Sequence, residues 1–226
     1  MTLDKQILDF YFTMPEDLEL PDGVDIIYPY NNSQTKALMK SFYHKYYNDS
    51  NVRGFLLGIN PGRLGSGITG IGFSDALSLE KYCHLENDFD KRAETSATFI
   101  YEVIQAYGGV ERFYKDFYIT AVMPMGLLKE KKNYNYYDDK KTIACLDDFI
   151  KSSMNKQLDF GAYRKDAICI GQGKNLKYLE SYNEEARVFE NIYTVPHPRW
   201  VMQYKRKEKH KHIDTYLEAF SKVLGK

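Results

Sequence analysis

Short apolar runs separated by helical patterns are the feature that most constrains how this chain folds. Four runs of this kind are predicted strands: residues 54–59, 117–122, 167–170 and 191–195. Each run is followed by a turn containing Gly, Asn or Pro, which marks the end of a strand. Strands that are apolar on both sides and alternate with helices form a parallel sheet covered by crossover helices.

Helical patterns fill the chain between and around these strands. The spacing of apolar residues and the flanking turn signals predict helices at residues 34–47, 96–107, 138–154 and 209–223. A chain of 226 residues is within the reach of one α/β unit, so a single domain over residues 1–226 is expected. Residues 1–50 are expected to form a helical extension packed on that domain.

Charge limits the partners that this chain can attract. Its 31 basic and 31 acidic residues cancel, so nucleic acid can be bound only through a local patch. The segment 199–211 supplies one, with six Lys or Arg residues against a single Glu. A basic run of this kind is, by itself, more typical of a solvated helix face.

Cysteine spacing and the N-terminus indicate the compartment. Cys83, Cys145 and Cys169 are far apart and form no Cys-x-x-Cys pair, so neither a disulfide framework nor a metal cluster is expected. The first residues lack the basic start and apolar run of a signal peptide, and no stretch has the apolar length of a membrane span. We therefore expect a soluble cytoplasmic protein, a monomer, without metal or other cofactor and without a membrane partner.

A glycine-rich loop follows the first predicted strand. Residues 60–73 contain five glycines, which let the backbone approach a ligand closely. The loop is not a phosphate-binding Walker A motif, because no Gly-Lys-Ser/Thr follows, and it lacks the spacing of a dinucleotide fingerprint. In open α/β sheets ligands bind beyond the carboxyl ends of the strands, which is where this loop lies.

The loop resembles the first motif of the uracil-DNA glycosylase superfamily, in its single-strand-selective monofunctional (SMUG-like) branch. That motif has the form Asn-Pro-Gly-x-x-Gly-x-x-x-Thr-Gly-x-x-Phe, and six positions fit it without a gap: Asn60, Gly62, Gly65, Thr69, Gly70 and Phe73. The second motif of the family, His-Pro followed by a loop that wedges into DNA, is matched by His197 and Pro198 after the last predicted strand. The segments 171–174 and 132–134 also look like short family loops, so the resemblance spans roughly residues 54–220.

The resemblance implies a three-layer α/β/α fold with a central, mostly parallel four-stranded sheet. It also implies a monofunctional DNA N-glycosylase, a hydrolase of base excision repair that flips uracil or a related damaged pyrimidine out of DNA. Asn60 would position the attacking water and His197 would stabilise the departing base.

The resemblance likewise implies which residues contact the base and the DNA. Gly62, Thr69, Phe73, Thr120 and Ala121 would surround the base, with Phe73 stacked on it. A wedge of residues 199–202, with Arg199 and Trp200 foremost, would fill the vacated stack, and Lys205, Arg206 and Lys207 would meet phosphates.

One strand departs from the family pattern. Family members end this strand in His-Asn before Cys-Pro, and that Asn recognises the edge of uracil. The matching positions here are Thr120, Ala121, Met123 and Pro124, so the amide that recognises the base is missing. The identity of the base stays open.

Two other functions remain compatible with the sequence. A catalytically weak or inactive protein of the same fold would bind a nucleotide or DNA without cleaving it, and Ala121 is the chief support for this alternative. A hydrolase of small nucleotides would need acidic metal ligands near the glycine-rich loop, where only Asp75 is available.

Overall fold

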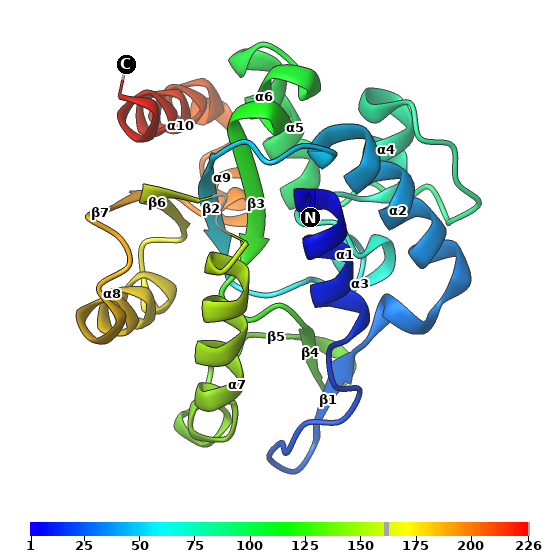
Figure 1. The fold of residues 1–226 in the computed structure, drawn as a ribbon, viewed down its shortest axis with the longest axis vertical. Helices are drawn as coiled ribbons and strands as arrows, with labels where there is room; N and C mark the ends of the chain where they lie inside the picture. Colours follow the sequence, from blue (N-terminus) through cyan, green and yellow to red (C-terminus); the bar gives the residue numbers. More distant parts are fainter. Residues whose placement is uncertain (161–162, 226) are drawn as a thin grey trace.

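A four-stranded parallel sheet forms the centre of the molecule (Figure 1). The computed structural model describes residues 1–160 and 163–225. The strand order is β3-β2-β6-β7, and all neighbours run parallel. The strands are β2 (Arg53–Gly58), β3 (Phe117–Ala121), β6 (Tyr163–Ile170) and β7 (Asn191–Val195). Each of the four predicted strands is therefore confirmed.

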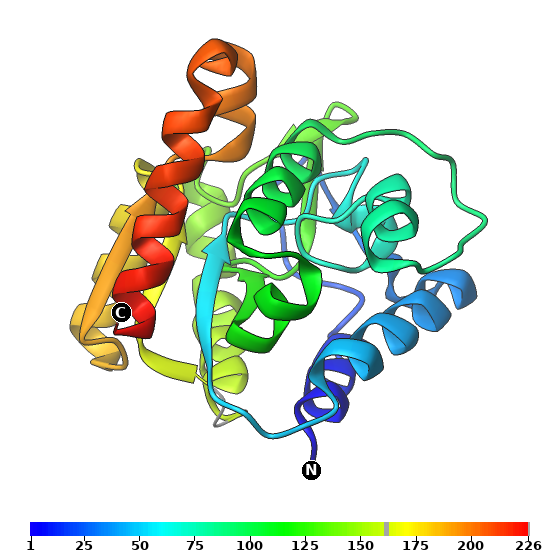
Figure 2. The same cartoon turned by 90° about the horizontal axis from the view of Figure 1, so that it is seen from above.

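Helices cover both faces of this sheet and complete the three expected layers (Figures 1 and 2). On one face lie α5 (Thr95–Tyr107), α6 (Val110–Asp116) and α10 (Lys209–Leu224). On the other face lie α7 (Lys140–Leu158) and α8 (Lys174–Ala186). Every residue of the central strand β2 is buried, because helices exclude water from both of its faces.

The first fifty residues are less uniformly helical than expected. They form α1 (Leu3–Phe12), β1 (Val24–Ile27), η1 (Pro29–Asn31) and α2 (Ser33–Tyr47). Strand β1 pairs antiparallel with β4 (Gly126–Lys129), which in turn pairs with β5 (Lys132–Tyr134). The helix predicted at residues 34–47 is present as α2, but strand β1 was not expected, because a four-residue strand carries too little pattern to be recognised before its distant partner is known.

The N-terminal helices α1 and α2 lie beside the β3 edge of the parallel sheet (Figure 1). Two side chains make this contact directly: Tyr47 Oη donates to the Phe117 carbonyl at 3.0 Å, and Tyr11 Oη lies 3.2 Å from Thr120 Oγ1. Residues far apart in the chain thus meet at β3, and the N-terminal segment reaches the carboxyl end of that strand.

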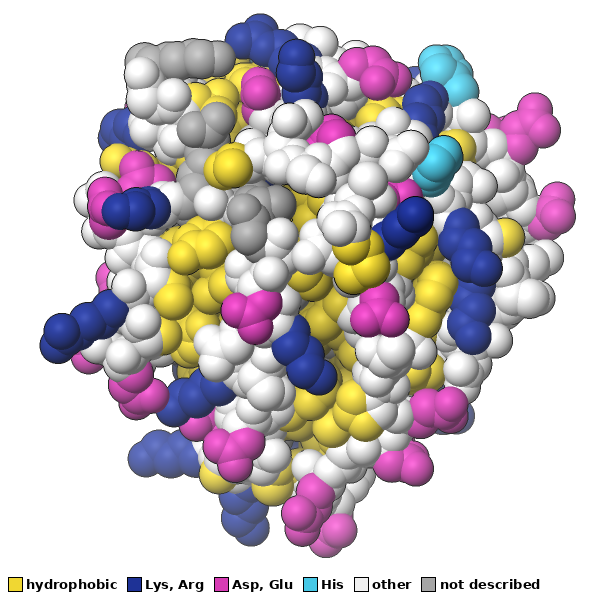
Figure 3. All heavy atoms as spheres, viewed as in Figure 1, with side chains coloured by type: hydrophobic (Ala, Val, Ile, Leu, Met, Phe, Trp, Pro, Cys, Tyr) yellow, Lys and Arg dark blue, Asp and Glu magenta, His cyan; other side chains and the backbone are white. Residues whose placement is uncertain are grey.

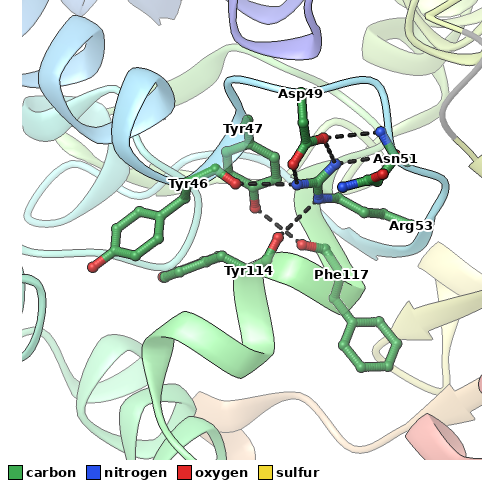
Figure 4. A network of polar contacts seen from close by, with 7 residues as sticks. All are labelled: Tyr46, Tyr47, Asp49, Asn51, Arg53, Tyr114 and Phe117. Carbon is green, nitrogen blue, oxygen red and sulfur yellow. Dashed lines mark hydrogen bonds and ion pairs between the residues drawn. The ribbon is translucent and has the colours of Figure 1, made fainter.

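A buried arginine closes the opposite, amino-terminal end of the sheet (Figure 4). Arg53, at the start of β2, is fully buried and forms two charged hydrogen bonds with the Asp49 carboxylate at 2.7 and 2.9 Å. Its guanidinium also donates to the carbonyls of Tyr46, Asn51 and Tyr114. Since a buried charge is tolerated only when it is paired and hydrogen-bonded, this network joins α2, β2 and α6 firmly.

The surface shows no large area of one charge on the face seen in Figure 3, where acidic and basic side chains are interspersed among apolar ones. This mixture agrees with a net formal charge of zero. Within the described ranges, no helix combines the length and apolar character that crossing a membrane requires.

Candidate functional site

A cavity lies at the carboxyl ends of β2 and β3, where ligand sites of open α/β sheets are found. Segments from seven parts of the chain enclose it. Its lining comprises residues 59–62, 66, 70, 72, 73, 120, 121 and 124, together with 11, 30, 94, 96, 133, 135, 197 and 199. Asn60 and His197, which the sequence placed in separate motifs, thus line the same cavity.

The Asn60 side chain is held at both ends of its amide. Its Nδ2 donates to the Tyr134 carbonyl at 3.1 Å, and its Oδ1 accepts from the Tyr136 backbone N–H at 3.4 Å. Tyr134 ends β5, so the small antiparallel sheet orients this amide. A carbonyl oxygen has two lone pairs, so Oδ1 retains the capacity to accept a hydrogen bond from a water.

His197 is the N-cap of helix α9 (Pro198–Tyr204). Its Nδ1 accepts from the Arg199 backbone N–H at 3.2 Å, which places the ring proton on Nε2. Burial, and to a lesser degree the charge of Arg199, lowers the pKa of His197 from 6.5 to about 4. At neutral pH the imidazole is therefore an uncharged donor through Nε2.

Phe73 lies beside His197, with ring centroids 6.0 Å apart and the planes tilted by 50°. The backbone of Phe73 has a φ of 51°, in the left-handed region that non-glycine residues seldom adopt. A Cβ atom at Gly58 would approach the Phe73 ring to 2.6 Å, so the glycine at the end of β2 makes room for the ring. Strained backbone of this kind persists only where the surroundings enforce it.

Thr69, which was expected to contact the base, lies inside the glycine-rich loop instead. It is fully buried, and its hydroxyl donates to the Ser74 carbonyl at 2.8 Å and accepts from the Ile71 N–H. Thr69 does not line the cavity. Its hydrogen bonds instead stabilise the loop that carries Phe73. Gly62, Thr120 and Ala121 do line the cavity.

The wedge residues lie on a helix rather than on a loop. Within α9, Val201 is fully buried and cannot enter DNA, so its assignment to the wedge was wrong. Helical periodicity turns Val201 toward the core while Arg199 and Trp200 remain exposed. Arg199 lines the cavity, and Trp200 packs edge-on against His212 at 5.7 Å.

The five basic residues of the run that follow α9 differ in their contacts. Lys209 pairs with Glu102 and Lys211 with Glu208. Lys205, Arg206 and Lys207 are exposed and form no ion pair within the described part of the chain. Lys205 directly precedes the short helix η2 (Arg206–Glu208), and Arg206 and Lys207 belong to it; η2 follows α9 and contacts it.

Carboxylates near the cavity are occupied by helix capping. Asp75 is the N-cap of α4 (Ala76–Cys83). Its carboxylate accepts from the Ser78 N–H at 2.7 Å and from the Glu94 N–H at 2.6 Å. Glu94 lines the cavity and caps α5 by accepting from the Ala97 N–H. No group of three or more His, Cys, Asp or Glu side chains arranged to hold a metal occurs in residues 1–160 and 163–225.

Tyr11 and Tyr30 line the cavity, although the sequence offered no reason to place them there. Tyr11 lies on α1 and Tyr30 on η1, with ring centroids 5.1 Å apart. Tyr30 Oη donates to the Pro124 carbonyl at 3.1 Å. Apolar spacing in residues 3–11 indicates a helix with one buried face, but nothing in it indicates which surface that face contacts.

These features define a class: three-layer α/β/α proteins with a cavity enclosed between an Asn-Pro-Gly loop and a His-Pro helix start, at the carboxyl edge of a parallel sheet. The family model for the uracil DNA glycosylase superfamily matches residues 44–221. The chain belongs to this superfamily.

A solved structure extends the likeness to the whole chain. The crystal structure of wild-type SMUG2 from Pedobacter heparinus is 39% identical, with a TM-score of 0.96 over 100% of both chains. The similarity therefore includes the first fifty residues, which the sequence motifs did not cover. A search of curated proteins finds no match.

Proposed function

We propose that this protein hydrolyses the N-glycosidic bond of uracil, or of a related damaged pyrimidine, flipped out of DNA. Membership of the superfamily and the similarity to SMUG2 support a uracil-DNA glycosylase. The observation that carries the proposal is His197, a neutral histidine whose proton is held on Nε2 at the wall of a cavity that also contains Asn60.

His197 stabilises the leaving base. When the glycosidic bond breaks, its electron pair stays on the base and the sugar becomes positively charged. The Nε2–H of His197 donates to the base oxygen on which negative charge develops. Because the ring is already neutral and oriented, it needs no reorganisation during the reaction.

Asn60 positions the water that attacks the sugar carbon. Its amide is immobilised by the backbone of residues 134 and 136, so Oδ1 accepts a hydrogen bond from a water in a defined direction. An amide is a poor base, which suits a reaction in which the bond to the base is largely broken before water adds. Phe73 stacks on the base, while Arg199 and Trp200 occupy the space it leaves in the DNA.

The test is release of base from a labelled oligonucleotide that carries one uracil, in single-stranded and duplex form. Alkali cleaves the abasic product, so excision appears as a shorter strand. His197→Ala should lower the single-turnover rate by about 10²- to 10³-fold, the cost of one donor at a developing anion. Asn60→Ala should also lower it, whereas His84→Asn, at an exposed helix end, should not.

Binding without cleavage is the second candidate. Ala121 brings no polar group to the cavity, where family members have an amide that recognises uracil. If no damaged pyrimidine is released but the oligonucleotide is bound, this candidate replaces the glycosylase. Release of uracil that does not depend on His197 would instead contradict the assigned mechanism.

A further inference from the structure

Three side chains form a hydrogen-bonded chain behind the wall of the cavity, next to Ala121. Tyr11 of α1 and Thr120 of β3 both line the cavity, and Gln157 of α7 lies behind them. Tyr11 Oη lies 3.2 Å from Thr120 Oγ1, and Thr120 Oγ1 lies 2.6 Å from Gln157 Oε1. All three are buried, with exposed fractions of 5%, 2% and 1%.

The distances settle the direction of the hydrogen bonds. A separation of 2.6 Å fits an O–H···O bond and is shorter than the usual range of N–H···O bonds, so Thr120 donates to the amide oxygen of Gln157. Having given its only proton to Gln157, Thr120 can only accept from Tyr11. The order of donation is Tyr11 to Thr120 to Gln157.

The amide nitrogen of Gln157 takes no part in this chain. Gln157 Nε2 is buried and has no hydrogen-bond partner among the described residues. A methionine would fill the same space without burying an unpaired donor, so the oxygen is the part of Gln157 that the structure uses. Through that oxygen, Gln157 fixes which way the Thr120 hydroxyl points.

Both hydroxyl protons are therefore consumed inside the protein, and the wall formed by Tyr11 and Thr120 has only oxygen lone pairs to offer a ligand. We infer that this wall selects bases that carry an N–H on their pairing edge, as uracil does at N3, and rejects cytosine, whose N3 is a lone pair. Gln157 is a positioning residue that acts through Thr120. The inference rests on the proposed function only in placing a flipped base in this cavity.

The same wall does not select for every group on the base. Ala121 has no polar side chain, so nothing at that position recognises the group on C4 of the base. Selection then depends on one donor of the base rather than on the paired hydrogen bonds of an amide.

The experiment measures binding, so that it does not depend on catalysis. Single-stranded oligonucleotides carry one 2′-fluoroarabino uracil or cytosine nucleotide, in which the fluorine opposes positive charge on the sugar and suppresses cleavage. Fluorescence anisotropy gives the two Kd values. Wild type should bind the uracil strand at least about tenfold more tightly than the cytosine strand. Uracil adds one hydrogen bond to the wall, whereas cytosine would bring the lone pair of N3 against the oxygen lone pairs.

Variants at Gln157 separate positioning from packing. Gln157→Met removes the acceptor at similar size and frees the Thr120 proton, so the cytosine-to-uracil Kd ratio should fall toward one. Gln157→Glu keeps an acceptor oxygen in either protonation state, so the ratio should be retained. Ser153→Ala, buried one turn earlier on the same helix, is the matched control and should leave the ratio unchanged.

Several results would overturn the inference. They are equal Kd values for the two strands in wild type, or a ratio that Gln157→Met leaves intact. If thermal melting shows that the methionine variant does not fold, Gln157→Asn, whose shorter amide cannot reach Thr120, must show the same loss of ratio. Failure of the proposed function gives a different result. In that case no uracil is released, but the cytosine-to-uracil Kd ratio still depends on Gln157.

Discussion

At the scale of single residues, the protonation state of His197 predicts how activity depends on pH. Its pKa is lowered to about 4 by burial and by Arg199, so the ring stays neutral well below pH 6.5. We expect kcat/KM for uracil release to remain level through pH 6.5 and to fall only as the pH approaches about 4. A pH profile of kcat/KM checks this, and a bend near the ordinary histidine pKa would contradict a ring that is neutral at pH 6.5.

The same shift affects stability with a definite sign. Between about pH 6.5 and 4, the unfolded chain binds a proton at His197 that the folded chain does not. Stability contributed by the neutral ring is therefore present above pH 6.5 and is lost as the pH falls through 4. His197→Ala should weaken this part of the pH dependence in urea unfolding.

Ala121 brings no polar side chain to the cavity wall. Ala121→Asn introduces an amide there, and we expect it to raise the preference for uracil over 5-substituted or oxidised pyrimidines. Sites built to hydrogen-bond a substrate discriminate by about 10⁴- to 10⁵-fold, whereas apolar pockets reach about 10- to 200-fold. Competition between the two substrates in one reaction measures the preference; wild type that already excises uracil alone would show that Ala121 is not the position that recognises the base.

At the scale of elements, the exposed cations around η2 should govern the attraction of DNA. Lys205, Arg206 and Lys207 are exposed, so replacing all three with Ala should flatten the slope of log affinity against log salt. The slope should change by about 0.7 to 0.9 for each DNA phosphate that the variant no longer neutralises. Fluorescence anisotropy over a range of salt concentrations provides the slope.

The matched control removes three lysines from the other end of the sheet. Lys5, Lys115 and Lys156 are exposed. Lys5 lies in the first turn of α1, Lys115 lies at the end of α6 shortly before β3, and Lys156 lies in the last turn of α7, which precedes β6. Their replacement changes the net charge equally but should leave the slope nearly unchanged. Equal slopes for wild type and the η2 variant would locate the DNA surface away from this helix.

At the scale of the whole molecule, the buried Arg53 network and the proposed active site lie at opposite ends of the sheet. The Arg53 network closes the amino-terminal end (Figure 4). The cavity lies at the carboxyl-terminal end. Asp49→Ala would leave the buried guanidinium without its carboxylate, which should cost about 3–5 kcal/mol of unfolding free energy. Urea denaturation measures the loss, and the rate of uracil excision by the folded fraction should be unchanged at about 25 °C.

Much of this architecture was predictable from the sequence. Four short apolar runs ending in Gly, Asn or Pro turns and alternating with helical patterns indicated the parallel sheet, because strands buried on both faces are apolar throughout. The motif around Asn60 and the His-Pro pair at 197–198 indicated the cavity loops through their resemblance to the uracil-DNA glycosylase superfamily. Neither prediction needed knowledge of distant contacts.

Tertiary structure decided the rest, because it depends on contacts between residues far apart in the chain. Strand β1 becomes a strand only against β4, and Tyr11 reaches the cavity only because α1 packs beside β3. Thr69 and Val201 fit the motifs but are turned inward by the loop and helix that hold them. A linear pattern specifies which residues are available, whereas packing decides which atoms face the ligand.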